Sequence, residues 1–310
     1  MEASIPAVDF QKLSSDEDEL KKLRDACEKC GCFRIMNHPI PLTLMADMKL
    51  VAKHLHDLPM DIKIRNKLAI LPDNGYVSLS VTSSIYEGLA ISDMHSSPHA
   101  IEDFCSELNV SNHHRQIIEA YGQAVHDLAS SVSQNLSEFL GIKDTDYFKN
   151  WKSIIRTMKY NFTPEAMGSI GAELHSDTGF ITLLHDDETV SGLELMDEHS
   201  SSFIAVPPKI GSFFCIIGDA GHVWSNGRFR NVRHRVVCKE AAARYSIGAF
   251  MSPRDGNVEA PSKLVELDHA QLYRPFKFDE LMKIKYEDLR GLKATTGKSA
   301  RDAVNQFRIG

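Results

Sequence analysis

The second half of the chain constrains the fold most. From about residue 153 onward, short β-rich runs alternate with turns that contain Gly, Pro, Asn and Asp. The clearest of these runs are FITLL, SFFCIIGD, FRNVRHRVVC and RYSIGAF. Many short strands joined by such turns are typical of a compact antiparallel barrel or jelly roll. We therefore expect a β core over residues 153–260.

The segments on either side of this core are predicted to be mainly helical. Apolar residues recur at helical spacing in residues 14–31, 42–58 and 111–140, and Gly31 and Gly141 can end two of these helices. Residues 278–292 predict a closing helix. The chain is thus divided into a mainly helical region with short strands (1–152), the β core (153–260) and a closing segment (261–310), and we expect all three to form one α+β fold unit.

The composition excludes several classes of protein. The 310 residues carry a net charge of −7 without a Lys/Arg cluster, which argues against nucleic acid and anionic membranes as partners. The N-terminus lacks the pattern of a signal peptide, and no apolar run is long enough to span a membrane. Six cysteines are too few for a disulfide scaffold. We expect a reduced, cytoplasmic monomer that binds a small molecule.

Two histidines and one aspartate form a candidate metal site. His175 and Asp177 are two residues apart, so on an extended backbone their side chains leave the same face, with Cα atoms about 6.6 Å apart. His234 lies in NVRHRVV and supplies a third ligand from an apolar strand face. Such a triad is typical of non-haem Fe(II) oxygenases, in which three coordination positions stay open. Zinc hydrolases also use two histidines and a carboxylate, so the triad alone leaves the metal open.

An arginine downstream narrows the choice. Arg244 follows His234 by ten residues, and Ser246 lies two residues further on the same strand face. A buried guanidinium needs an anionic partner, which is either a structural Asp or the carboxylate of a ligand. Arginine binds a carboxylate through two parallel hydrogen bonds, and the Ser246 hydroxyl can add a third. A dicarboxylate held by metal at one end and by Arg244 at the other fits this arrangement.

With these motifs the chain resembles the plant-type Fe(II)/2-oxoglutarate-dependent dioxygenases over almost its whole length. The resemblance rests on IPAVDF, GCFRIMNH, HSDTGFITLLHDD, GLELMD, GDAGHVWSNGRFRNVRHRV and ARYSIGAF. It implies a double-stranded β-helix, a distorted jelly roll with flanking helices. It also implies that His175, Asp177 and His234 hold Fe(II). Arg244 and Ser246 would bind the distal carboxylate of 2-oxoglutarate, with O₂ as the second co-substrate and ascorbate as a reductant.

One element departs from the family pattern. Tyr160 in RTMKYNF matches the tyrosine of the family's N-x-Y element, which contacts 2-oxoglutarate, but Met158 stands where the family has Asn. Because the intact Asp177 leaves no vacant ligand position for chloride, the resemblance implies an oxidising or hydroxylating site rather than a halogenating one.

Within the family, the chain is most similar to the dioxygenases for auxin oxidation, which convert indole-3-acetic acid to 2-oxindole-3-acetic acid. LMADMK, YEGLAISDM, SPHAIEDFC, LLHDDE, WSNGR and CKEAAARYSIGAF carry this likeness. Residues 75–89 are expected to border the active site, yet they contain no Arg, Lys or His that would pair with an acetate group. The candidate residues of an apolar and aromatic substrate pocket are Tyr76, Tyr86, Phe162, Trp224 and Phe250.

Two other functions remain open from the sequence. Related dioxygenases hydroxylate or otherwise oxidise specialised metabolites such as alkaloids or phenolics. A resemblance therefore indicates the type of reaction more securely than it indicates the substrate. A cupin-like binding protein without turnover is the non-enzymatic alternative. The complete set of metal and 2-oxoglutarate residues argues against it, because a binding module has no need for a 2-oxoglutarate clamp.

Overall fold

Two β-sheets form the centre of the molecule in the computed structural model, which describes residues 5–67, 75–77, 85–91, 99–142, 148, 151–198, 200–253, 256–266, 270–289 and 300–310. In this part of the chain the larger sheet has seven strands, in the order β1 (Ala7–Asp9), β2 (Cys32–Met36), β9 (Phe213–Ile217), β6 (Ile181–His185), β11 (Arg244–Pro253), β4 (Trp151–Tyr160) and β3 (Tyr86–Ile91). The smaller sheet has the order β5 (Ile170–His175), β10 (His234–Val237), β7 (Leu193–Asp197) and β8 (Ser202–Ala205).

These sheets form the double-stranded β-helix that the sequence predicts. All neighbouring strands are antiparallel except β1 and β2, which are parallel. The N-terminal region contributes β1, β2 and β3 to the larger sheet, and the expected boundary between residues 152 and 153 lies inside β4. The helical region and the β core therefore share one sheet, as one α+β unit.

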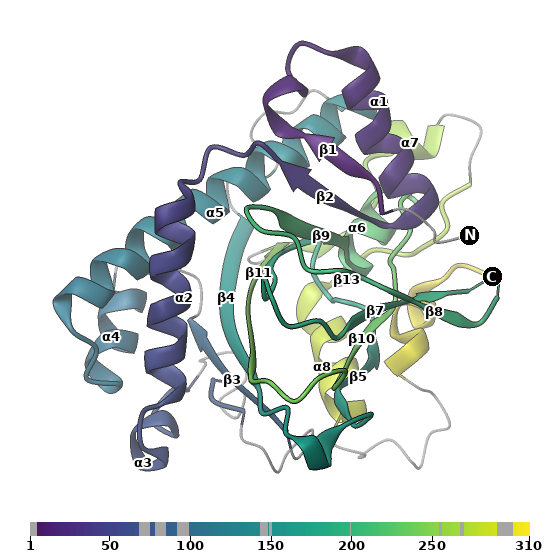
Figure 1. Ribbon diagram of the computed structural model, residues 1–310. Helices are drawn as coiled ribbons and strands as arrows, with labels where there is room; N and C mark the ends of the chain where they lie inside the picture. Colours follow the sequence, from purple (N-terminus) through teal and green to yellow (C-terminus); the bar gives the residue numbers. More distant parts are fainter. Residues whose placement is uncertain are drawn as a thin grey trace.

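Helices cover the outer face of the larger sheet (Figure 1). The long helix α5 (Asn112–Phe139) and α2 (Leu42–His56) pack against each other and against β11. Both confirm the sequence prediction, as does α1 (Glu17–Asp25), which continues through the π-turn Ala26–Cys30 to Gly31. Gly31 has φ +72°, and a Cβ there would lie 2.4 Å from the carbonyl oxygen of Arg230, so only glycine fits. The short helices α3 (Met60–Lys63) and α4 (Ala100–Glu107) lie beyond α2.

The C-terminal segment forms a small cluster of its own. The segment contains β12 (Asn257–Val258), α7 (Ser262–Glu266), β13 (Phe276–Lys277), α8 (Phe278–Leu289) and the 3₁₀ helix Ala300–Phe307, of which α7 packs into the larger core through Leu264. Tyr273, Phe276 and Phe307 pack there with residues of α6 (Asp219–Trp224). The predicted closing helix is therefore present over 278–289, and residues 290–299 lie outside the described residues. No helix of the described chain is both long and apolar enough to cross a membrane.

Alternation along the strands separates two hydrophobic cores. On β11, Ile247, Ala249 and Met251 point toward the helices and join the cluster that includes α2 and α5. On the opposite face, residues of β4, β6 and β9 pack with Leu193 and Val236 of the smaller sheet. This second face lines the interior of the barrel. It also carries Arg244 and Ser246, so the predicted co-substrate residues point inward.

Candidate active site

The three predicted metal ligands lie together at one end of the barrel interior. His175 ends β5 and His234 begins β10, and these two residues are directly paired across the smaller sheet. Asp177 follows in the turn after β5. One Oδ of Asp177 lies 3.7 Å from Nε2 of His175 and 3.8 Å from Nε2 of His234. One ligand atom from each residue lies within 4.8 Å of the others, so all three can face a single ion.

Two further residues hold the turn that carries Asp177. The Thr182 hydroxyl on β6 donates a 2.6 Å hydrogen bond to Oδ2 of Asp177, which orients Oδ1 toward the histidines. Lys285 on α8 donates to the carbonyl oxygen of Ser176 at 2.7 Å and forms a buried ion pair with Asp219. Partners of this kind fix the orientation of metal ligands and tune their affinity.

The charge states suit a divalent cation. Burial alone would raise the pKa of Asp177, but His234, His175, the Thr182 hydroxyl and Lys285 together lower it below its ordinary value, so the side chain is a carboxylate. Burial lowers the pKa of His234, which favours the neutral imidazole. Metals bind carboxylates and neutral imidazoles, which are the forms that these shifts favour for Asp177 and His234.

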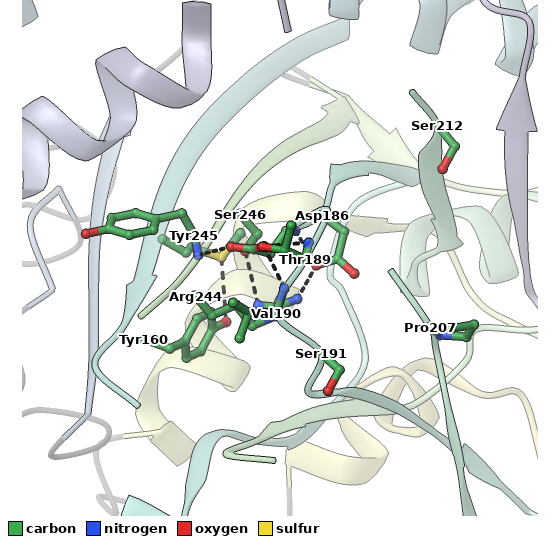
Figure 2. A network of polar contacts seen from close by, with 12 residues as sticks. Tyr160, Asp186, Thr189, Val190, Ser191, Pro207, Ser212, Arg244, Tyr245 and Ser246 are labelled. Atoms are coloured by element: carbon green, nitrogen blue, oxygen red, sulfur yellow. Dashed lines mark hydrogen bonds and ion pairs between the residues drawn. The ribbon is translucent and has the colours of Figure 1, made fainter. Parts of the chain in front are cut away.

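Arg244 marks the other end of the site. Its side chain is 1% exposed and lies among Asp186, Ser246 and Tyr160, as Figure 2 shows. Nη2 forms an ion pair with Asp186, and Nη1 lies 3.4 Å from the Ser246 hydroxyl. The guanidinium carbon lies 5.1 Å from the centre of the Tyr160 ring. Nε of Arg244 is buried and donates no hydrogen bond within the described chain, so the group keeps an unused donor.

Charged groups of both signs surround Arg244. Burial raises the pKa of Asp186, and Arg244 opposes this shift. Arg34 on β2 also lowers the pKa of Asp186, and donates to the Ser212 hydroxyl at 3.2 Å and to the carbonyl of Pro207. The neighbouring carboxylate of Asp187 raises the pKa of Asp186 further, so two guanidinium groups face two carboxylates at this end. The carboxylate of a ligand would accept the unused Nε donor of Arg244, so the residues fit 2-oxoglutarate.

Tyr160 lies at the arginine end of the interior. It pairs with Arg244 across β4 and β11, and its ring lies against Gly171 of the smaller sheet, where a Cβ would be only 2.6 Å away. Burial raises the pKa of Tyr160, so the phenol stays protonated and can donate. Its hydroxyl points to the sulfur of Met158 at 4.0 Å, a weak acceptor that leaves the proton available to a ligand.

Three of the predicted pocket residues lie in or beside the barrel interior. Tyr86 on β3 packs against Tyr160, with ring centres 5.2 Å apart. The Phe250 ring lies over Gly248, on the inward face of β11. Phe162 is buried behind Tyr160 at 5.7 Å and fills the space beside Gly192. Phe162 therefore supports the arginine end, whereas Tyr86 and Phe250 are half-buried.

The other two belong elsewhere, which corrects the sequence interpretation. The Tyr76 hydroxyl donates to Glu87 at 2.9 Å, and Glu87 points to the helix side of β3, away from the barrel interior. Trp224 is 1% exposed and packs edge-on against Phe180 at the end of the hydrophobic core. The rest of the expected border segment, residues 78–84, lies outside the described residues.

Sequence reasoning missed Asp186, Thr182 and Lys285. Thr182, Leu184 and Asp186 are every second residue through β6 into the following turn, so they face the same side. This period-two pattern could have indicated Thr182 and Asp186. Lys285 gave no signal, because α8 is brought to the metal turn only by the packing of the C-terminal cluster, 109 residues along the chain from Ser176.

Comparisons with known proteins agree with this geometry. Residues 151–253 match the 2OG-Fe(II) oxygenase superfamily, and residues 5–95 match the N-terminal region of non-haem dioxygenases described from morphine synthesis. The chain is 38% identical to the 2-oxoglutarate-dependent dioxygenase DAO of Oryza sativa subsp. indica, over 97% of each chain.

Solved structures give the same result. The crystal structure of the dioxygenase for auxin oxidation from rice has a TM-score of 0.85 at 38% identity, covering 99% of this chain and all of that one. The dioxygenase for auxin oxidation 1 of Arabidopsis thaliana, in a complex with 2-oxoglutarate, has a TM-score of 0.81 at 42% identity, covering 86% of this chain and all of that one. Because family match, full-length identity and fold agree, the chain belongs to the 2OG-Fe(II) oxygenase superfamily and is a 2-oxoglutarate-dependent dioxygenase.

Proposed function

We propose that this enzyme oxidises indole-3-acetic acid to 2-oxindole-3-acetic acid. The full-length likeness to the rice and Arabidopsis dioxygenases for auxin oxidation is the observation that carries this proposal. The half-buried aromatic side chains of Tyr86 and Phe250 beside the site support it, because an indole ring needs an apolar and aromatic surface. We expect the enzyme to act as a cytosolic monomer.

In this proposal His175, Asp177 and His234 hold Fe(II), and Arg244, Ser246 and Tyr160 bind the distal carboxylate of 2-oxoglutarate. When bound, the iron and co-substrate supply the oxidising chemistry, in which one oxygen atom of O₂ enters the substrate and the other enters succinate, with release of CO₂. The protein itself positions the groups: Thr182 orients Asp177, and Asp186 keeps Arg244 in place before the co-substrate arrives.

The Tyr160 phenol donates a hydrogen bond to the bound carboxylate and stays protonated throughout the reaction, because burial raises its pKa. Tyr160, Phe162 and Leu193 exclude water from the arginine end, since all three are buried in the same cluster. In such a dry environment the ion pair between Arg244 and a carboxylate is stronger than it would be in water.

The test is a reconstitution. Purified protein is loaded with Fe(II) without oxygen and then mixed with air, 2-oxoglutarate and indole-3-acetic acid. We expect equal amounts of succinate and singly oxygenated product by mass spectrometry, and neither when Zn(II) replaces Fe(II). Succinate release that indole-3-acetic acid does not stimulate would refute the auxin proposal and direct the search to alkaloids and phenolics.

A further inference from the structure

The inward face of β4 carries a second arginine that the site described above does not use. Tyr160, Met158 and Arg156 alternate along this strand, and Tyr160 points into the barrel. Arg156 therefore points the same way. It lies opposite Gly248 on β11 and opposite Ala90 on β3.

Contacts around Gly88 place the end of this side chain. A Cβ at Gly88 would lie 2.6 Å from the hydroxyl of Tyr86 and 3.5 Å from Nη1 of Arg156. The phenol and the guanidinium therefore end above the same glycine, and a larger residue at this position would displace them. Met158 and the Phe250 ring lie beside them, because both would be within 3.4 Å of a Cβ at Gly248.

The strand register locates Arg156 between the two ends of the site. Arg244 pairs with Tyr160 at the co-substrate end, and Phe250 pairs with Thr182, which holds Asp177 at the metal end. Gly248, the partner of Arg156, lies between Arg244 and Phe250 on the same face of β11. A group bound at Arg156 is thus about two residues along the sheet, roughly 7 Å, from the level of Thr182.

We propose that Arg156 binds the carboxylate of the organic substrate and so selects aromatic acids over neutral aromatic compounds, with the Tyr86 hydroxyl as a second donor. This inference rests on the proposed dioxygenase function and supplies the cation that residues 75–89 lack. A guanidinium binds a carboxylate in a bidentate manner. Phe250 and Met158 offer the apolar surface that an aromatic ring attached to that carboxylate would contact.

Other cations of the described chain have different positions. Arg244 and Arg34 surround Asp186 at the co-substrate end. Lys63 and Lys159 lie on the helix side of the sheet with Glu87, which is opposite to the barrel interior. Arg244, Arg34 and, by strand alternation, Lys152 also lie on the inward face. Arg156 differs from them because its guanidinium ends above Gly88 beside the Tyr86 hydroxyl.

The experiment compares acids with their amides in matched variants. Binding of indole-3-acetic acid and indole-3-acetamide is measured by calorimetry in protein loaded with Zn(II) and 2-oxoglutarate, which prevents turnover. Arg156→Gln is expected to weaken binding of the acid about 10- to 100-fold, because it removes a hydrogen bond between charged groups, and to change amide binding by less than about threefold. Arg156→Lys keeps the positive charge but loses the paired donors of the guanidinium, so its affinity for the acid is expected to lie between those of the parent and Arg156→Gln.

Lys159→Gln is the matched control, since it removes a cation from the other face of the same strand, and it should leave the acid-to-amide ratio unchanged. Equal losses for acid and amide in Arg156→Gln would mean a structural role and overturn the inference. A parent that binds amides as tightly as acids would overturn it as well.

Phenylacetic acid, benzoic acid and their amides extend the comparison to acids other than auxin. If the parent rejects indole-3-acetic acid but prefers another acid to its amide through Arg156, the auxin proposal fails and this inference stands. If the parent binds none of the acids, the inference is overturned.

Discussion

The two ends of the barrel interior differ in how exposed their charged side chains are and in whether these side chains have a partner of opposite charge. At the metal end, three acceptors converge from β5, its following turn and β10, and His175 keeps 43% of its side chain exposed. At the arginine end, the charge is already buried, and Asp186 neutralises Arg244 in the absence of any ligand. A cation bound at the metal end would meet three ligands of the protein. A carboxylate bound at the arginine end would instead share Arg244 with Asp186.

This difference predicts which end also stabilises the fold. A half-exposed histidine makes few contacts that folding depends on, so its loss affects function alone. A buried ion pair behaves differently, because removing one partner leaves the other charge uncompensated in a medium of low dielectric constant. Each of the following substitutions would break or sharpen this contrast.

The largest effect is expected at the metal end. His175→Ala removes one of three ligands, so iron binding and succinate production should fall to the level of the iron-free protein. Because the side chain is half-exposed, the free energy of unfolding should change by less than about 1 kcal/mol. Iron content by atomic absorption and denaturation by urea measure the two effects separately. Activity near that of the parent would show that His175 is not a ligand.

At the arginine end, function and stability should be lost together. Arg244→Ala leaves Asp186 buried without its cation, which is expected to cost about 3–5 kcal/mol of unfolding free energy and to abolish 2-oxoglutarate binding. In the double variant Arg244→Ala, Asp186→Asn, stability should return in large part but binding should not. Urea denaturation and calorimetry with 2-oxoglutarate test this cycle. Equal stability of the single and double variants would show that the pair does not stabilise the fold.

The metal triad was predictable from the sequence because it depends on strand geometry. His175 and Asp177 alternate at period two, and His234 lies on an apolar strand face, so their convergence follows once a barrel is assumed. Arg244 and Ser246 were predicted by the same alternation, and Tyr160 by the family resemblance alone. The structure brings all three to one end of the interior.

Positions set by packing between distant segments were not predictable. Trp224 is in α6, and the sequence could not indicate that this short helix turns its ring into the core beside Phe180. Tyr76 was misassigned because its direction depends on Glu87 and Lys63, a buried pair whose members are 24 residues apart. Aromatic residues near a motif are equally suited to a core and to a pocket, so residue type alone did not separate the two.

A smaller effect is expected from the residue that supports the metal turn. Lys285→Met removes the donor to the Ser176 carbonyl and the partner of Asp219, so Asp177 is held less firmly. We expect iron affinity to fall about tenfold, as for other residues that orient metal ligands. Competition with a chelator measures it. Lys283→Met on the exposed side of α8 is the control, and an equal loss there would assign the effect to the helix rather than to this contact.

The smallest effect is expected from Asp186→Asn, which tests whether Asp186 and 2-oxoglutarate compete for Arg244. In Asp186→Asn the like charge that faces the distal carboxylate of 2-oxoglutarate is gone, so the dissociation constant should fall about threefold at neutral pH. Burial raises the pKa of Asp186, so as pH falls this carboxyl takes up a proton before an exposed one would, while 2-oxoglutarate is still ionised. Parental binding should therefore strengthen toward acidic pH, and the advantage of the variant should shrink. A ratio of dissociation constants that stays constant from pH 8 to pH 5 would mean that Asp186 only positions Arg244 and does not compete with the co-substrate.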